Sequence, residues 1–485
     1  MRNERYAAWV LLRPSDLPLP SSSARQKAQR LLEQALGPSK VVTDPDLCES
    51  YVHDESEAEG ITPDAVVLAE SADDILAALR VAREAGVPIT PRAAGTGRTG
   101  GAVPAAGGIV LATRGMKNIK EIDRRDGVAV VEPGVVLADL HAAVEAEGWF
   151  YPPDPNSLAD CCLGGNIAEN AGGPRAFKYG VTRDWVIGLE AFLIGGQRLR
   201  TGRRTTKGVT GYDVTALLVG SEGTLAVFGD ATLKLMPKPQ QVMTLLVLYT
   251  DVRAAGRSVE AAIGAGLYPR CIELLDGPTL DAMRRAGNAI DQRAGAMLLV
   301  EVDGDAEACE REATRFGETA DKAGALEVLV AQDAAQRERL WSARRDMSRA
   351  VRKLSKKKLS EDVVVPRQKI DALLEHVATT SERDGVRHLT YGHAGDGNLH
   401  VNFLWDDESE VPAVERAIEG LFREVVRLGG TLSGEHGIGV LKAPYLPLEQ
   451  SADLISLQRD LKRVFDPQHL LNPGKIFPTG THRAC

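Results

Sequence analysis

The sequence predicts an α+β protein built from more than one domain. At 485 residues the chain is too long for one simple hydrophobic core, which favours about two to four domains. Apolar strands and amphipathic helices alternate from about Ala65, and a proline-rich stop at Met236–Pro239 separates this part from a following part without glycine loops. The expected divisions are an N-terminal segment 1–61, a first domain 62–240, a cap 241–430 and a C-terminal segment 431–485.

The first domain is expected to begin with alternating strands and helices. Ala65–Leu68 is apolar, and Ser71 with the acidic residues after it is a typical helix N-cap. We therefore predict a helix that reaches Ala85 and ends at Gly86. Further strands are predicted at Val87–Thr90, Gly108–Ala112 and Val128–Val131, a helix at Leu137–Glu147, and strands with turns over 186–240.

The cap repeats strands and helices without loops of the cofactor-binding type. Near its end, Gly395–Asn398 is a strong turn signal between two apolar runs that read as strands. We therefore expect a hairpin that brings His393 and His400 to one place. Other expected cap elements are strands at Thr244–Tyr249 and Met297–Glu301 and helices at 252–265, 305–323 and 335–353.

The composition is ordinary for a soluble globular enzyme, with 44% apolar and 26% charged residues. A net charge of −9 argues against nucleic-acid binding. The six cysteines form no C-x-x-C pair, so we expect free thiols in a reducing compartment and no iron–sulfur cluster. No apolar run approaches the roughly 20 residues of a membrane span, and the N-terminus lacks a secretory cleavage pattern. The expectation is a cytoplasmic protein, with peripheral contact at the inner membrane face left open.

Four loop segments, three of them glycine-rich, follow one another along the first domain. The first, Pro91–Gly101, comes directly after a predicted strand, and its backbone N–H groups can form a nest for a diphosphate. Its spacing is neither that of a Rossmann loop nor that of a Walker loop. The segments 152–157, 164–173 and 220–225 carry small residues with amide or hydroxyl groups, which suit a flat ring and a polyol chain.

Histidines gather late in the chain, although the whole sequence has only nine of them. With Glu435 as a third ligand, His393 and His400 would form the nitrogen and oxygen ligand set of a catalytic divalent metal with one open position. Zinc is the first expectation, and manganese and iron accept the same ligands. His436 is then the candidate base. Asn402 shares a strand face with His400 and would orient a substrate.

A second candidate group lies on the predicted helix 335–353. The Arg344 guanidinium can bind a carboxylate through two parallel hydrogen bonds. Ser348 lies four residues later, on the same helical face. Together they form the expected carboxylate clamp. A surface ion pair is the alternative role for Arg344.

Taken in this order, the four loop segments resemble the flavin adenine dinucleotide (FAD)-binding domain of the vanillyl-alcohol oxidase superfamily. Tyr391–His400, Gly434–Gly437 and Leu471–Lys475 narrow the resemblance to the branch with D-lactate dehydrogenase, the glycolate oxidase flavin subunit and D-2-hydroxyglutarate dehydrogenase. The resemblance covers about residues 40–477. It implies a two-lobed FAD-binding domain that the C-terminal tail completes, with an α+β cap domain inserted before that tail.

The resemblance also implies where FAD would bind. Ala93–Thr99 would wrap the diphosphate, while Asp154–Asp160, Ala168–Ala171 and Glu222–Phe228 would line the flavin. The loop 91–101 has neither His nor Cys, so FAD is expected to be non-covalent, although Cys161 and Cys162 lie near the third segment. The residues implied to contact FAD are Arg92, Ala93, Ala94, Gly95, Thr96, Gly97, Arg98, Thr99, Asp154, Ser157, Gly165, Asn166, Ala168, Asn170, Ala171, Ile187, Glu222, Gly223, Thr224 and Asn472.

The function implied is an FAD-dependent dehydrogenase for a small D-2-hydroxy acid, D-lactate or glycolate. It would form the 2-oxo acid by hydride transfer to flavin N5, with metal-assisted deprotonation of the hydroxyl. D-2-hydroxyglutarate is a second candidate, but relatives acting on dicarboxylates carry a lysine where Ser360 stands. Two further alternatives are a transferase like alkyl-dihydroxyacetonephosphate synthase and a non-catalytic flavin-binding subunit, and the metal-type residues argue against both.

The expected partners follow from the redox chemistry. The sequence offers no second redox centre, so electrons would leave through a separate acceptor. Candidates are an electron-transfer flavoprotein, a quinone and an iron–sulfur subunit. The small 2-hydroxy acid is the other partner, and a homodimer is left open.

Overall fold

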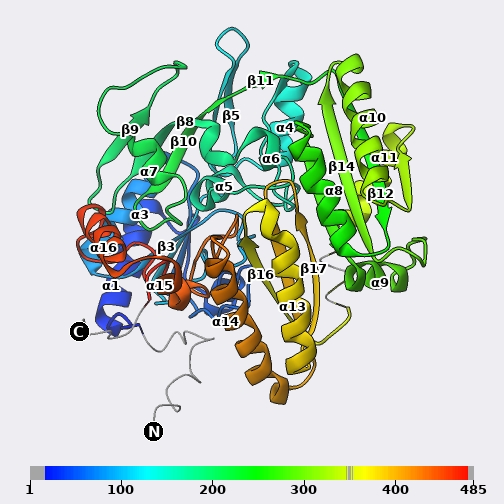
Figure 1. Ribbon diagram of the computed structural model, residues 1–485. Helices are drawn as coiled ribbons and strands as arrows, with labels where there is room; N and C mark the ends of the chain where they lie inside the picture. The colour runs from blue at the N-terminus through cyan, green and yellow to red at the C-terminus, as the bar shows by residue number, and fades with distance from the viewer. Residues whose placement is uncertain (1–16, 346, 348–350, 352, 479–485) are drawn as a thin grey trace.

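The computed structural model describes residues 17–345, 347, 351 and 353–478. Three main sheets organise the chain: a four-stranded and a five-stranded sheet in its N-terminal half and a seven-stranded sheet in the cap. In Figure 1 the blue N-terminal elements and the red C-terminal helix lie on the same side of the molecule, away from the green and yellow cap. No helix within the described ranges has both the length and the apolar character to cross a membrane.

The first lobe is a small sheet whose strands run in the order β1-β2-β4-β3. Strands β2, β4 and β3 are parallel, with Ile89 opposite Ile109, and β1 is antiparallel to β2. The glycine-rich segment begins as β3 ends, as predicted. Its elements are α1 (Ser22–Leu36), β1 (Val41–Val42), α2 (Pro45–Cys48), η2 (Glu49–Tyr51), β2 (Ala65–Leu68), α3 (Ala72–Ala85), β3 (Ile89–Arg92) and β4 (Ile109–Ala112).

Helix α3 confirms the predicted capping residues. The Ser71 side chain accepts a hydrogen bond from the Asp74 N–H, and Gly86 ends the helix with φ +67°. Its buried face, with Ile75 and Leu79, packs in the core of this lobe. Strand β3 begins two residues later than predicted because the Val87 N–H still donates to the end of the helix, at Ala82 O.

The second lobe is an antiparallel sheet in the order β5-β6-β10-β8-β9, with a separate pair β7-β11. Helices α4 and α5 pack against it and share one apolar core with it. The elements are β5 (Ile119–Asp123), β6 (Val128–Val131), α4 (Leu137–Ala146), β7 (Trp149–Phe150), α5 (Leu163–Glu169), α6 (Ala176–Tyr179), η3 (Thr182–Asp184), β8 (Val186–Phe192), β9 (Arg198–Gly202), α7 (Val214–Leu218), β10 (Val227–Lys234) and β11 (Met236–Pro237).

The cap is one sheet in the order β15-β12-β14-β13-β17-β18-β16, with every strand antiparallel to its neighbours. The predicted hairpin is confirmed as β17 and β18. The predicted helix over 335–353 is α11 up to residue 345, and its later part lies partly outside the described residues. The elements are β12 (Gln241–Tyr249), α8 (Val252–Gly264), β13 (Cys271–Asp276), α9 (Gly277–Arg285), β14 (Ala296–Gly304), α10 (Ala306–Lys322), β15 (Glu327–Val330), α11 (Ala334–Arg345), β16 (Lys357–Val364), η4 (Arg367–Lys369), α13 (Ile370–Asp384), β17 (Arg387–His393), β18 (Asn398–Trp405), η5 (Glu408–Glu410) and α14 (Val411–Arg427).

After the cap the chain returns to the first lobe. Leu471 forms a parallel bridge to Ile89 on β3, so the tail extends the sheet that precedes the glycine-rich segment. The buried Lys462 ammonium donates to Thr224 O at 2.6 Å, to Leu471 O at 2.8 Å and to the Asp466 carboxylate at 2.6 Å. The tail elements are η6 (Ala443–Tyr445), α15 (Leu446–Glu449) and α16 (Ala452–Phe465).

We expect Lys462→Ala to lower the free energy of unfolding by about 3–5 kcal/mol, because it leaves the Asp466 charge buried without its cation. Denaturant titration measures this change. The control is Asp453→Ala on the exposed side of the same helix, which should cost less than about 1 kcal/mol. Equal losses in the two variants would show that Lys462 does not tie the tail to the loop that carries Thr224.

Candidate active site

The cap sheet turns one face to its helices and the other face to a cavity. On β18, Val401 and Phe403 belong to the core beneath the helices, so the alternation of a strand directs His400 to the opposite face. The register then sets its neighbours, because His400 lies opposite Tyr391 on β17 and opposite Asp362 on β16. Side chains from three strands therefore meet on the cavity face.

Two histidines and one glutamate converge on this face. His393 Nε2 lies 3.4 Å from Glu435 Oε1, and His400 Nε2 lies 3.5 Å from the same oxygen. One ligand atom from each of the three residues falls within 4.8 Å of the others, and the two rings stand nearly perpendicular, at 88°. The predicted hairpin thus brings His393 and His400 together, and a separate loop supplies Glu435.

Glu273 orients His393 from behind. It lies opposite His393 on the neighbouring strand β13, and its Oε1 is 2.5 Å from His393 Nδ1. Burial lowers the pKa of His393, but the charge of Glu273 outweighs burial and raises that pKa well above its usual value. The carboxylate fixes which ring nitrogen points inward, as carboxylates behind metal-binding histidines do. His393 therefore directs Nε2 toward Glu435.

Asp362 holds the loop that carries Glu435 and His436. Its Oδ2 accepts hydrogen bonds from the backbone N–H groups of Gly434, Glu435 and His436 at 2.8–2.9 Å. Its Oδ1 accepts one from the Asn398 amide. Burial opposes its ionisation, but the neighbouring His436 ring, the Lys442 ammonium and the Asn398 hydrogen bond hold the pKa of Asp362 well below its usual value. The charged carboxylate therefore fixes the loop against the hairpin.

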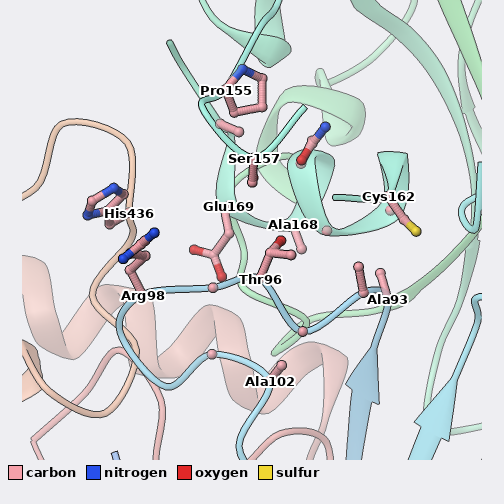
Figure 2. Close-up of a pocket in the computed structure, with 18 of the residues that line it drawn as sticks. Ala93, Thr96, Arg98, Ala102, Pro155, Ser157, Cys162, Ala168, Glu169 and His436 are labelled. Atoms are coloured by element: carbon pink, nitrogen blue, oxygen red, sulfur yellow. The ribbon is translucent and has the colours of Figure 1, made fainter. Parts of the chain in front are cut away.

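His436 lies beside the three converging residues. Its ring stacks on His400 with centroids 5.3 Å apart and planes 10° apart, and its Nε2 is 3.9 Å from Glu435 Oε1. Burial lowers the pKa of His436 despite the attraction of Asp362. The ring is therefore neutral near pH 7 and can accept a proton. In Figure 2 His436 and Arg98 lie on the same side of the cavity.

The predicted carboxylate clamp is only partly described. Arg344 is buried and lines the cavity, but its Nε and Nη2 already donate to Glu273 Oε2, at 2.9 and 2.7 Å. Its guanidinium also lies 4.8 Å from the centroid of the Tyr391 ring. Ser348 lies outside the described residues. The structure excludes the surface ion pair, since Arg344 is 5% exposed.

Asn402 shares the face of His400, as predicted, but it is not among the residues that line the cavity. It is completely buried, and its side-chain amide donates to His400 O at 3.0 Å. Ser360, which lies opposite it on β16, does reach the cavity. Asn402 therefore supports the strand behind His400.

One continuous cavity joins the glycine-rich segments to the histidines (Figure 2). It spans about 1460 Å³ of space, part of which is open to solvent. Sequence-predicted FAD contacts in its lining are Arg92, Ala93, Ala94, Gly95, Thr96, Gly97, Arg98, Ser157, Gly165, Asn166, Ala168, Ala171, Glu222 and Gly223. His393, His400, Glu435, His436 and Arg344 line the same cavity.

Six of the predicted FAD contacts are outside this lining. Thr99 donates its hydroxyl to His436 O at 2.9 Å, and the Asn472 amide donates to Gly101 O and Glu222 O at 3.0 and 2.7 Å. Asp154 pairs with Arg175 at 2.9 Å. The structure places these side chains behind the wall, where they hold its loops together. The six are Thr99, Asp154, Asn170, Ile187, Thr224 and Asn472.

The other three of the six also have local roles. Asn170 ends α5 in the left-handed conformation and accepts a hydrogen bond from the Arg183 N–H. The Thr224 hydroxyl donates to Ser221 O inside the buried turn. Ile187 lies on β8 of the second lobe. A resemblance in sequence cannot separate such residues from true lining residues, because both belong to the same loops.

The residues of the cavity fit a dinucleotide. Arg92 Nη1 and Asn166 Nδ2 are buried donors without a hydrogen-bond partner within the described part of the chain. Such donors suit phosphate and carbonyl oxygens. Cys162 is the cysteine in the lining, and burial raises the pKa of its thiol to about 11. A thiol of this kind is a poor nucleophile, which agrees with a non-covalent cofactor.

Sequence reasoning missed several residues that shape this site. Glu273 fixes His393, and Asp362 fixes the loop that carries Glu435 and His436. Period-two alternation along strands β13 and β16 was the available signal. Neither strand was predicted, so nothing in the sequence showed that these side chains face the histidines.

Two stretches of the chain match described families. Residues 63–202 match the FAD binding domain family, and residues 238–476 match the family described as FAD linked oxidases, C-terminal domain. The first stretch contains the first three loop segments, and the second contains the whole cap with the histidine cluster.

Curated relatives match over most of their length. Glycolate oxidase subunit GlcD of Bacillus subtilis (strain 168) is 42% identical over 430 residues, which is 88% of this chain and 92% of that protein. The protein of the same name from Escherichia coli (strain K12) is 36% identical over 87% of this chain and 84% of its own. D-lactate dehydrogenase of Anaerostipes hadrus is 33% identical over 91% and 95%.

Solved structures share the fold at low sequence identity. Substrate-bound p-cresol methylhydroxylase superposes with a TM-score of 0.80 at 16% identity, covering 94% of this chain and 98% of that chain. Alkyldihydroxyacetonephosphate synthase superposes with a TM-score of 0.74 at 17% identity, covering 94% and 87%. The predicted fold, with two FAD-binding lobes and an α+β cap, is therefore confirmed.

We expect Asp362→Ala to lower the free energy of unfolding by about 3 kcal/mol or more, because it removes the buried acceptor of three backbone N–H groups at 434–436. Denaturant titration gives this loss, and hydrogen exchange at 434–436 should accelerate. Asp281→Ala removes an exposed ion pair with Arg284 and should cost about 0–1 kcal/mol. Unchanged exchange at 434–436 in the Asp362 variant would contradict the role assigned to this carboxylate.

Proposed function

The chain belongs to the FAD-linked oxidases, and we propose that within this family it oxidises a small D-2-hydroxy acid, D-lactate or glycolate, to the 2-oxo acid. One observation carries the proposal: the cap places a metal-type cluster, a neutral histidine and a buried arginine in the cavity that the FAD-binding segments line. The names of the relatives, glycolate oxidase subunit and D-lactate dehydrogenase, support the same class of substrate.

The proposed metal ligands are His393, His400 and Glu435. Burial holds the pKa of His400 well below its usual value, so its imidazole is neutral and suited to a metal. Glu435 Oε2 is buried without a hydrogen-bond partner among the described residues. Zinc is our first choice, with manganese or iron accepting the same ligands. When bound, such an ion would lower the pKa of a substrate hydroxyl.

His436 is the proposed base. Its ring is neutral, buried and stacked on His400, and its backbone N–H donates to Asp362, which keeps the ring in place. A neutral imidazole here can take the proton that the substrate hydroxyl releases. FAD, when bound, would supply the redox chemistry by taking the hydride of the substrate carbon.

Arg344 is the proposed binding group for the substrate carboxylate. Glu273 fixes its guanidinium from one side, so the group is held rigidly at the cavity wall. Burial strengthens its attraction for an anion. Ser360 in the lining offers a neutral hydroxyl instead of a second cation, which favours a monocarboxylate over D-2-hydroxyglutarate. Alkyl transfer remains the rival chemistry, because the fold alone serves it equally well.

The electrons must then pass to a separate acceptor. The described cysteines are free and buried: Cys48 lies on α2, Cys161 and Cys162 directly precede α5, Cys271 lies on β13 and Cys309 on α10. We propose an electron-transfer flavoprotein, a quinone or an iron–sulfur subunit as the acceptor class. A protein named as a subunit among the relatives is consistent with a partner chain.

The direct test is anaerobic bleaching of the flavin absorbance by a panel of D- and L-2-hydroxy acids. We expect D-lactate or glycolate to bleach the flavin in a single turnover, with D-2-hydroxyglutarate much slower. If every hydroxy acid leaves the bound flavin oxidised, the dehydrogenase proposal is wrong and alkyl transfer becomes the better reading.

We expect His436→Ala to slow flavin reduction by the acid about 10²–10⁴-fold while FAD stays bound, because the base is lost. Stopped-flow absorbance measures the rate, and protein-bound flavin is counted in the same sample. His388→Ala is the matched control, since His388 lies on β17 but outside the cavity lining. A His436 variant that is reduced at the wild-type rate would remove this residue as base.

We expect His400→Ala to lose the bound divalent metal and most of the reduction rate, because one of three ligands is gone. Metal content by elemental analysis and the anaerobic rate are measured together. The exposed His53→Ala should retain both. Retention of metal and rate in the His400 variant would refute the metal site. A chelator should reproduce the loss in the wild-type protein.

A further inference from the structure

Glu169 is an acidic residue of the cavity that the proposed mechanism does not use. It is the last residue of helix α5 and belongs to the lining. Figure 2 shows its side chain in the cavity beside Thr96 of the glycine-rich segment, with Arg98 on the other side. Its Oε2 is closed off from solvent and has no hydrogen-bond partner among the residues that the structure describes. The carboxyl group therefore has bonding capacity left for a ligand.

A second carboxylate lies close to Glu169. A Cβ placed on Gly437 would come 2.2 Å from Glu169 Oε2 and 3.0 Å from Glu222 Oε1, so both carboxyl groups crowd the same point. A Cβ on Gly101 would also come 2.6 Å from Glu169 Oε1. Two buried negative charges at this separation repel each other strongly. One of the two groups should therefore carry a proton.

The hydrogen bonds indicate which group is charged. Glu222 Oε1 accepts from the Ile438 N–H at 2.8 Å, and Glu222 Oε2 accepts from the Gly439 N–H at 2.7 Å. Burial raises the pKa of Glu222 too, but the two backbone donors, with Lys475 and Lys442 nearby, oppose that rise and favour its carboxylate form. Glu169 lacks such donors at Oε2, and burial together with the Glu222 charge raises its pKa well above the usual value. The proton therefore belongs on Glu169.

The proton on Glu169 matters for the binding of FAD. The diphosphate is anionic, and reduced flavin also carries negative charge, so an ionised glutamate in the lining would repel the cofactor. A neutral carboxylic acid instead offers one O–H donor to an oxygen or nitrogen of the ligand. We propose that Glu169 is held as a neutral acid by Glu222 and donates a hydrogen bond that positions FAD. The proposal rests on FAD binding in this cavity and not on which hydroxy acid is oxidised.

The test compares two substitutions in the full chain. Glu169→Gln keeps a hydrogen-bond donor without any charge, while Glu169→Leu removes both donor and acceptor. FAD affinity is measured by titrating the apoprotein, and the flavin midpoint potential is measured with dithionite and a reference dye. Glu33→Gln, an exposed change on α1 outside the cavity lining, controls for the loss of one formal carboxylate. Neither readout needs the substrate, so failure of the proposed oxidation leaves this test intact.

We expect Glu169→Gln to keep FAD affinity within about threefold and the midpoint potential unchanged, whereas Glu169→Leu weakens affinity up to ~10-fold. Clearly tighter FAD binding and a more positive potential in Glu169→Gln would show that the native group is charged, which overturns the proposal. Unchanged affinity and potential in both variants, whatever their thermal stability, would reduce Glu169 to a structural residue and also overturn it.

Discussion

The buried carboxylate of Asp362 is the interaction on which the site depends. One carboxylate oxygen accepts hydrogen bonds from the backbone N–H groups of the loop 434–436, and the other accepts one from the Asn398 side-chain amide. This single carboxylate therefore joins the loop to the hairpin. A buried charge of this kind is costly unless it is fully hydrogen-bonded. Because these hydrogen bonds satisfy the Asp362 carboxylate, Glu435 and His436 keep fixed positions against His393 and His400. Without the Asp362 carboxylate, nothing described here would hold Glu435 next to His393 and His400.

Side chains alternate between the two faces of the cap sheet, and the C-terminal tail returns to the first lobe. Together these two features place the FAD-binding loops and the histidine cluster in one cavity. One sheet face packs on helices, and the opposite face carries Glu273, His393 and His400 toward the FAD-binding lobes. The tail meanwhile pairs Leu471 with Ile89, on the strand that leads into the glycine-rich segment. The lobes thus supply a cradle with unpartnered donors, and the cap supplies acids, bases and one arginine. Neither part alone contains a complete site.

Much of this arrangement could be predicted from local sequence signals. The Ser71 cap, the turn between His393 and His400 and the glycine-rich segments all act over a few residues, and each occurs where expected. The partners Glu273 and Asp362 could not be predicted, because their roles depend on pairing between strands distant in the chain. The sequence of the loops also did not show which residues line the cavity and which lie behind the lining, because contacts with distant segments determine this. Packing decides that distinction.

The proposed site is one cavity that holds FAD beside a metal bound by His393, His400 and Glu435. The most direct measurement is an anomalous diffraction map from crystals of the FAD-bound protein supplied with zinc or manganese. We expect one anomalous peak between the Nε2 atoms of His393 and His400 and the Glu435 carboxylate, with flavin density in the same cavity. Flavin density there without an anomalous peak at the three residues, or a peak held by other residues, would contradict the proposed site.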